Sequence, residues 1–121
     1  MDKAELKLRT KTFGLRVLKL VRHLPREVGA DVVGRQVIRS ALSVGANYRS
    51  ACRGRSRAEF LSKLGVVLEE VDESAFWLEI IIEDGMLPAA KVSALLLEAN
   101  ELTAIFFTAT GTTRRTPLPK S

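Results

Sequence analysis

Apolar residues recur at three- and four-residue spacing in four separate stretches of this 121-residue chain, and short segments with proline or glycine divide the stretches. This spacing places the apolar side chains on one face of an α-helix. It predicts helices over residues of about 4–24, 31–53, 57–84 and 88–109. No stretch alternates apolar and polar residues with the period of two that marks a strand. We therefore expect an all-α fold, an up-down-up-down four-helix bundle, because short connections make neighbouring helices antiparallel.

Punctuation residues set the ends of these predicted helices. Pro25 stops the first helix, and Asp31 is the expected N-cap of the second. The segment 56–59, Ser-Arg-Ala-Glu, has the S-x-x-E form of a capping box. In this motif the serine oxygen and the glutamate each satisfy a free backbone N–H group. Gly85 suits the left-handed position after the third helix, and Pro88 suits the first position of the fourth.

Length and composition favour one domain, residues 1–110, followed by a disordered tail over residues 111–121. No apolar run reaches the roughly 18 residues that cross a bilayer, and charges near the N-terminus leave no room for a signal peptide. The single cysteine, Cys52, excludes an internal disulfide and is expected to be a structural thiol. We therefore expect a cytoplasmic protein with no membrane partner.

The charge of the chain is divided between its two halves. Residues 1–57 hold 14 Lys and Arg against 4 Asp and Glu, a net of +10, whereas residues 58–121 hold 5 against 10, a net of −5. The sum of these two values is the formal net charge of +5. Such a chain must neutralise itself in the fold, pair head to tail with copies of itself, or bind a polyanion.

Four arginines of the second predicted helix fall opposite its apolar stripe and form one basic row. The row spans roughly 27 Å at the rise of an α-helix, which matches several phosphates along a nucleic-acid backbone. Basic residues of the first helix and of the following turn enlarge it. The same row also fits a solvated face, or partners for the acids of another helix or subunit. The predicted nucleic-acid-binding residues are Arg35, Arg39, Arg49, Arg53, Arg55, Arg57, Lys11, Lys19 and Arg22.

Several predicted helices keep apolar residues outside their core stripe. Trp77 is the clearest case, because an indole needs both apolar cover and a partner for its N–H group. Together with Ile80, Val66 and Leu15 it predicts a subunit interface, and helices with two apolar faces favour a homo-oligomer. The alternative is that the phase of a long helix drifts and Trp77 borders the core.

Catalytic and metal sites find little support in the sequence. His23 is the only histidine, so a histidine-based metal site cannot form within one chain. The pairs Glu70/Glu73 and Glu98/Glu101 each face one way on a helix, and we expect them to pair with the basic helices rather than hold a cation. No nucleophile, base and orienting group come together. We therefore expect no enzymatic activity, no metal and no cofactor.

Small residues gather around Gly45 in the second predicted helix. Glycine in a helix interior costs about 1 kcal/mol relative to alanine, so we expect that its missing side chain lets another helix approach closely. A hinge or a phosphate-binding glycine is the alternative, although the Gly-rich spacing of a P-loop is lacking. Asn47 and Tyr48 lie near the core side, where we expect Glu70 or Asn100 to supply hydrogen-bond partners.

The segment 40–60, which contains Ser-Ala-Leu-Ser-Val-Gly-Ala-Asn-Tyr-Arg and ends in Ala-Glu-Phe, resembles a known family. Further matches lie in Glu-Glu-Val-Asp-Glu-Ser at 69–74, Trp-Leu-Glu at 77–79 and Glu-Ala-Asn-Glu-Leu at 98–102. The chain resembles, over most of residues 10–107, the four-helix-bundle proteins encoded in intervening sequences of bacterial 23S ribosomal RNA.

Proteins related to that family include the accessory protein of diversity-generating retroelements, a basic homopentamer that associates with nucleic acid and a reverse transcriptase. The resemblance therefore implies a ring-like homopentamer with nucleic acid as a partner, and it implies no catalytic residues. The acidic second half of this chain sets it apart from the more uniformly basic accessory proteins.

Two functional hypotheses follow. The first is a non-enzymatic, oligomeric protein that binds nucleic acid, in particular RNA, through phosphate contacts on its first two helices. The second is a structural or interaction scaffold, or an accessory subunit for a protein such as a reverse transcriptase. In that second hypothesis the same arginines meet Glu69, Glu73, Glu79 and Asp84 of the next subunit.

Overall fold

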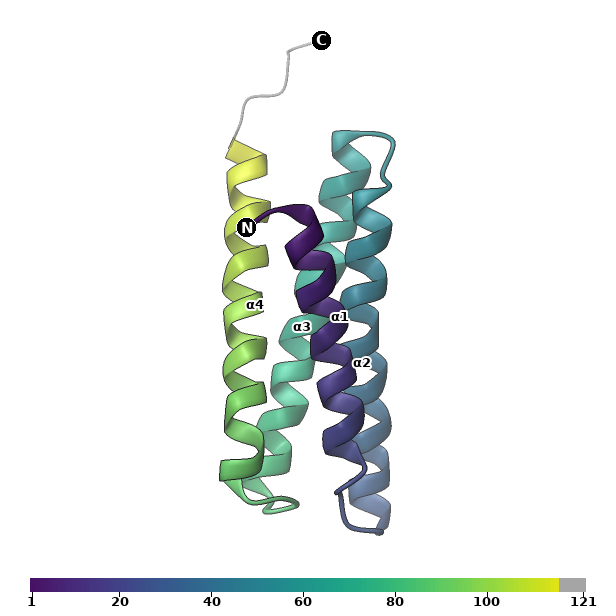
Figure 1. Cartoon of the computed structure of the whole chain (residues 1–121), viewed down its shortest axis with the longest axis vertical. Helices are drawn as coiled ribbons and strands as arrows, with labels where there is room; N and C mark the ends of the chain where they lie inside the picture. The colour runs from purple at the N-terminus through teal and green to yellow at the C-terminus, as the bar shows by residue number, and fades with distance from the viewer. Residues whose placement is uncertain (116–121) are drawn as a thin grey trace.

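The computed structural model describes the backbone of residues 1–115 and the side chains as far as residue 111. Its helices are α1 (Lys3–Val21), α2 (Val28–Cys52), α3 (Arg57–Glu83) and α4 (Ala89–Arg115). They lie along a common axis (Figure 1), with the α1–α2 and α3–α4 connections at one end and the α2–α3 turn at the other. Each helix packs against the next one in the sequence, whereas α1 touches α4 only sparsely. The expectation of an all-α fold with four helices is confirmed for the described residues.

The first helix is shorter than its predicted range. α1 ends at Val21 rather than near Leu24, and the chain then turns through hydrogen bonds from His23 N–H to the Leu20 carbonyl (3.0 Å) and from Leu24 N–H to the Val21 carbonyl (3.1 Å). Pro25 is the physical reason, because a proline disfavours helical backbone at the residue before it. The last predicted turn therefore tightens into i→i+3 bonds.

The second helix begins earlier than predicted. α2 starts at Val28, and Glu27 is the N-cap residue without a side-chain capping bond. Asp31, the expected cap, lies in the first turn instead. An acid in the first turn favours the positive end of the helix dipole, so it supports a helix start without capping it. Asp31 therefore marks the start of the helix, as predicted, but it lies in the first turn rather than at the N-cap.

The fourth helix begins directly after Pro88 and runs past the predicted end near residue 109. Gly111 does not end it, because a helix tolerates a single glycine at a cost of about 1 kcal/mol. Residues 111–115 are therefore helical rather than part of a disordered tail. The rest of the predicted tail, residues 116–121, lies outside the described residues.

The two strongest punctuation signals are confirmed. Ser56 Oγ accepts a hydrogen bond from the N–H of Glu59 (3.1 Å), and the Glu59 carboxylate accepts one from the N–H of Arg55 (2.5 Å). Gly85 has φ of 74°, and it ends α3 in a Schellman motif closed by its own N–H and that of Met86. These ends fix the α2–α3 and α3–α4 turns.

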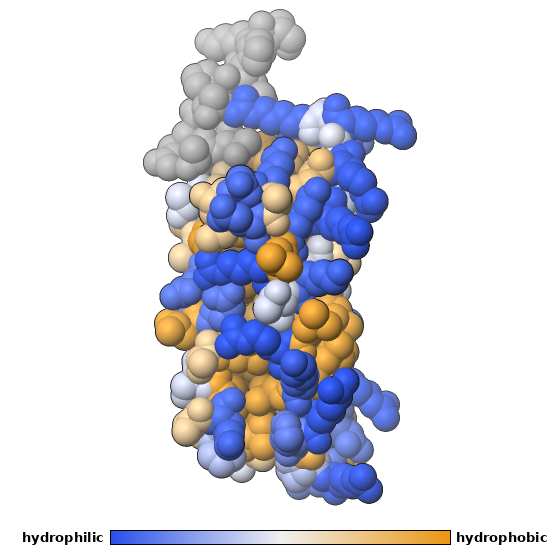
Figure 2. Space-filling view, viewed as in Figure 1, coloured by the Kyte–Doolittle hydropathy of each residue, from blue (hydrophilic) through white to orange (hydrophobic). Residues whose placement is uncertain are grey.

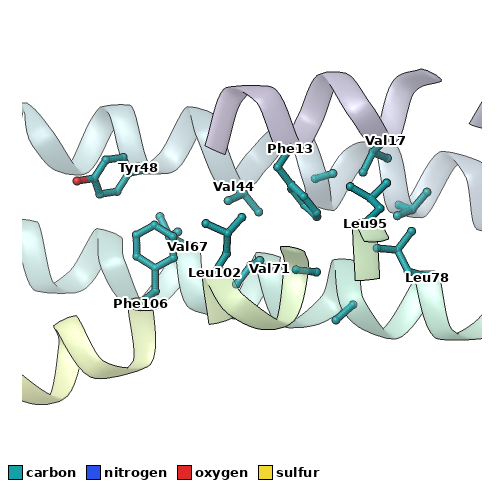
Figure 3. Packing of buried hydrophobic residues seen from close by; sticks show 14 of the residues in the cluster. Phe13, Val17, Val44, Tyr48, Val67, Val71, Leu78, Leu95, Leu102 and Phe106 are labelled. Carbon is teal, nitrogen blue, oxygen red and sulfur yellow. The ribbon is translucent and has the colours of Figure 1, made fainter. Parts of the chain in front are cut away.

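Apolar side chains of all four helices fill the interior (Figure 3). Tyr48 faces Phe106 at one end of the cluster, with ring centroids 5.3 Å apart. Burial raises the pKa of the Tyr48 hydroxyl, and a hydrogen bond with the half-buried Cys52 raises it further. This phenol is therefore neutral and structural, and Cys52 lies beside it as a structural thiol.

One buried polar contact joins α2 to α3. Ser74 Oγ lies 2.8 Å from Ser40 Oγ, and Ser40 donates to a carbonyl of its own helix. The single Ser74 proton is shared between Ser40 Oγ and a carbonyl of α3. A slip of one helix along the other would leave both buried hydroxyls with one partner fewer, so the pair fixes the register. Asn47 makes no such contact, because its Nδ2 donates to the Ser43 carbonyl one turn earlier (2.9 Å). The predicted partners of Asn47 on the other helices were wrong.

The predicted pairing of carboxylates with the basic helices is confirmed. Arg9 of α1 donates two parallel hydrogen bonds to Glu98 of α4 (2.7 and 2.8 Å) and a third to Glu101 (2.8 Å). Arg39 of α2 meets the second carboxylate pair on α3. The Arg9 hydrogen bonds hold the pKa of Glu98 below its ordinary value, although partial burial opposes this shift. Arg9 thus ties α1 to α4, a neighbouring helix with which it otherwise makes few contacts.

Substitution of Arg9 tests this tie. Arg9→Gln is expected to lower the free energy of unfolding by about 1 kcal/mol near pH 7, because a bidentate, partly buried pair is lost. A lowered pKa means that the folded state binds the Glu98 proton less tightly than the unfolded state does. The stabilisation is therefore present above the ordinary pKa of 4.5 and is lost as the pH falls through the lower folded-state value. Urea unfolding at neutral and acidic pH measures it, with Lys91→Gln as an exposed control. An equal difference at both pH values would contradict the assignment.

Two glycines are expected to respond in opposite ways. A methyl group added at Gly65, inside α3, meets no heavy atom within 4 Å, so Gly65→Ala is expected to stabilise the protein by about 1 kcal/mol. A Cβ at Gly45 would lie 3.4 Å from backbone atoms of Thr10 and Lys11, which confirms the predicted close approach of α1. Gly45→Leu is therefore expected to destabilise. Denaturant unfolding of both variants measures the two changes in the free energy of unfolding. Changes in the same direction would refute this account.

Candidate nucleic-acid interface

Arg35, Arg39 and Arg49 of the predicted row lie exposed on α2, and Arg53 is the exposed residue that follows it at the C-cap. The four arginines have different surroundings. Arg35 makes no ion pair with the residues that the structure describes. Arg39 turns towards α3, Arg49 lines a groove beside α1, and Arg53 lines a hollow at the α2–α3 turn. The row is therefore not one uniform surface, and each arginine is considered with its neighbours.

Arg39 is occupied by its own chain. One guanidinium nitrogen lies 3.1 Å from the Glu70 carboxylate, and the other contacts Glu73. These two acids face one way on α3, one turn apart, and the Ser40–Ser74 contact sets the register that brings Arg39 beside them. Because two carboxylates already surround this arginine, a phosphate there would meet a negative surface. Arg39 therefore drops out of the predicted phosphate-binding set.

A groove with a volume of about 570 Å³ runs between α1 and α2. Small residues of both helices form its floor, because α1 lies against Gly45 with no side chain between the backbones. Three exposed leucines and three cations line its walls, and no acid is among the lining residues. Figure 2 shows apolar patches among long hydrophilic side chains on the face that carries α1. The cations are Lys7, Lys11 and Arg49, and the leucines are Leu8, Leu15 and Leu42.

A second hollow of about 320 Å³ lies at the α2–α3 turn. Arg53 and Arg55 converge there with Lys63, a cation that the sequence pattern did not single out. Glu59 also lines it, but its carboxylate is occupied as a cap for the start of α3. Arg57 lies beside the turn at the first position of α3, where it is half-buried. Three cations thus surround one concave surface at this end of the bundle.

The other end of the bundle is basic as well. Gly34 of α2 faces Val21 and Leu24, so the last turn of α1 lies against the first half of α2. Arg22 and Arg35 are exposed beside this contact, and Lys19 lies one turn before Arg22. Basic side chains thus follow α1 and α2 from one end of the bundle to the other. We call this surface the basic strip: Lys11, Lys19, Arg22, Arg35, Arg49, Arg53, Arg55 and Lys63.

The predicted interface residues divide into two groups. Val66 and Leu15 are exposed, as an interface requires, whereas Trp77 and Ile80 are half-buried and pack against the margin of the core. The premise that Trp77 would be exposed to solvent in a monomer was wrong. The helical phase drifts along α3 and turns this side chain towards the core. On α3 the neighbouring Phe76 is exposed instead, at 51% of its surface, and its ring packs edge-on against the indole with ring centroids 5.0 Å apart.

The core accounts for only part of the apolar composition of α4, because 28% of its most apolar stretch is buried. Its segment Ala89–Gly111 is long and apolar enough to cross a membrane, and it is the one such segment among the described residues. Val92, Leu102 and Phe106 from this segment lie buried against the other helices. The same helix supplies the two acids that pair with Arg9. Within residues 1–111, no group of three or more His, Cys, Asp or Glu side chains is placed to hold a metal ion.

Comparisons with known proteins agree with this architecture. Residues 3–107 match the model of a family described as 23S rRNA-intervening sequence protein. A crystal structure from Bacteroides thetaiotaomicron, of a protein of unknown function in the S23 ribosomal protein family, superposes with a TM-score of 0.83. The two sequences are 28% identical, and the match covers 92% of this chain and 99% of the other. No match was found among curated proteins.

The different surroundings of Arg35 and Arg39 predict different effects on stability. Arg39→Gln is expected to lower the free energy of unfolding by about 0.5–1 kcal/mol, because Glu70 and Glu73 then lie side by side without a cation. Arg35→Gln removes the same charge but no ion pair within the described residues, so its stability is expected to stay within about 0.5 kcal/mol of wild type. Thermal unfolding of both variants at low ionic strength measures the difference. Equal effects would show that the Arg39 contacts contribute nothing.

Proposed function

Because the chain belongs to the family of 23S rRNA-intervening sequence proteins, we propose that it is a non-enzymatic protein that binds RNA through the basic strip. The observation that carries this proposal is the continuity of the strip, which follows α1 and α2 along the whole bundle. The acids lie elsewhere, mainly on α3 and α4. An elongated polyanion matches such a surface better than a compact ligand does.

The ion pairs within the chain leave the strip almost intact. Arg9 and Arg39 bind carboxylates of the neighbouring helices. Neither belongs to the strip, so within a single subunit its eight cations make no ion pair in the described residues and can bind an external anion. Their long side chains are suited to phosphate oxygens, and an aromatic content of 6% offers few rings to stack on bases. Recognition is therefore directed at the RNA backbone, with little base readout.

Assembly would multiply this surface. The proposal takes each subunit as an up-down-up-down bundle within a ring-like homo-oligomer in the cytoplasm, a pentamer by analogy with the related accessory proteins. Repetition of one strip around a ring raises the effective concentration of sites along a single RNA strand. Weak phosphate contacts in each subunit then combine into stable binding without any new contact.

A scaffold function is the second candidate, and one observation favours it. Arg39 shows that an arginine of the basic row can serve acids of a neighbouring helix rather than a phosphate. In this alternative, the strip meets acids of another subunit or of a protein partner such as a reverse transcriptase. Charge reversal would then break the assembly, whereas the RNA-binding proposal predicts loss of binding from an intact assembly.

RNA binding is tested by its dependence on salt. For a single-stranded RNA, the logarithm of the binding constant is expected to fall with the logarithm of salt concentration, by about 0.7 for each phosphate neutralised. The double variant Arg35→Gln with Arg53→Gln removes two contacts, so its salt slope is expected to be shallower by about 1.4 and its binding weaker. Fluorescence anisotropy with a labelled RNA measures both quantities.

Lys91→Gln is the matched control, because it removes a charge from an exposed position on α4, away from the strip. It is expected to leave the salt slope unchanged. Binding that does not respond to salt, or that survives the double substitution with the same slope, would overturn the proposal.

A further inference from the structure

The α1–α2 groove is apolar and cationic at once, a combination that phosphate binding alone does not require. We propose that the groove receives the outer face of α3 from a second copy of this chain. The inference deepens the oligomeric part of the proposed function, since it states which two faces meet. It does not depend on whether the oligomer binds RNA.

The residues that line the groove recur at the spacing by which a helix packs against another helix. Ala4, Leu8, Lys11 and Leu15 of α1 are spaced by four, three and four residues, and all four line the groove. Opposite them, Leu42 and Arg49 of α2 are seven residues apart. Seven-residue spacing with apolar positions is the pattern by which a helix receives the side chains of a further helix. The groove is therefore shaped for a helix.

The outer face of α3 carries a seam of the same period. Val66, Glu69 and Phe76 lie on the side away from the core, spaced by three and seven residues, and Glu73 between them is already paired with Arg39. Val66 and Phe76 are exposed by 38% and 51%, and the edge-on indole of Trp77 supports the Phe76 ring. The face therefore presents two apolar side chains, ten residues apart, among acids.

Charge complementarity selects this occupant. The groove holds three cations and no acid, whereas the segment 64–90 contains no Lys or Arg. Of the seven acids in that segment, only Glu70 and Glu73 are paired with Arg39 in the described residues. The four that remain exposed on α3 are Glu69, Asp72, Glu79 and Glu83. Groove against groove, or α3 against α3, would oppose like charges, so the two unlike faces are the ones that attract.

Such a contact is head to tail. Each copy offers a groove to one neighbour and its α3 face to another, so the assembly is heterologous and grows into a ring or a filament. It also divides the basic residues by role. Lys7 and two members of the basic strip, Lys11 and Arg49, become buried between subunits. In the assembly, RNA therefore meets the two ends of the strip, which include Arg35 and Arg53.

Two variants test the contact from its two sides. Phe76→Lys places a cation on the α3 face, and Leu42→Asp places an acid in the groove. Both positions are exposed in the single chain, so circular dichroism is expected to show an unchanged helix content. Each variant alone is expected to be monomeric by light scattering at a concentration at which the wild type is oligomeric. Phe107→Lys is the control, because it alters an exposed phenylalanine of α4, and it is expected to keep the wild-type mass.

Mixing the two variants gives the decisive measurement. Phe76→Lys keeps an intact groove and Leu42→Asp keeps an intact α3 face, so one heterologous contact remains possible. The mixture is expected to form a 1:1 dimer and nothing larger. A monomeric wild type, an unchanged mass for either variant, or a mixture that stays monomeric would overturn the proposal. RNA binding by the single variants is read separately: if the variants behave as expected but RNA is not bound, the proposed function fails and this inference stands.

Discussion

The contact between the backbones of α1 and α2 is the constraint on which the rest of the surface depends. Gly45 lies against the backbone around Thr10, and Gly14 lies against Leu42, so the two helices approach with little side-chain material between them. Longer side chains are pushed to the rims, where they become the walls of the groove. The same approach brings the basic faces of both helices to one side of the bundle. A bulkier residue at these positions would separate the helices and disperse both features at once.

The sequence predicted the elements of the fold well and their ends less well. Helical period identified all four helices because burial on one face is imposed along the whole length of each. Ends depend on a few residues, and a signal such as Asp31 marks a first turn as readily as a cap. The Ser56 box and Gly85 were located correctly because each motif specifies its own backbone geometry.

The sequence predicted which charged residues form the candidate site, but it did not predict the neighbours of each one in the fold. The helical period of the sequence placed the four arginines of the basic row on one side. It could not show that Arg39 would meet Glu70 and Glu73, because this ion pair depends on the register between α2 and α3. The groove was missed because it arises from two helices together. Leu8 and Leu15 gave the available signal, seven residues apart on a face that the core did not need. Phe76 was missed for a related reason, because a small rotation of α3 exchanged its exposure with that of Trp77.

Each side of α2 makes a different contact. It buries Val37 and Val44 in the core, offers glycine to α1, fixes the register with Ser40 and carries arginines outwards. Each face of α2 makes one of these contacts, whereas the outer face of α4 makes none of them among the residues whose side chains are described. Sequence drift among relatives should therefore be distributed unevenly. Substitutions would accumulate first along the outside of α4, and α2 would change slowly, because almost any replacement there alters two relationships at the same time.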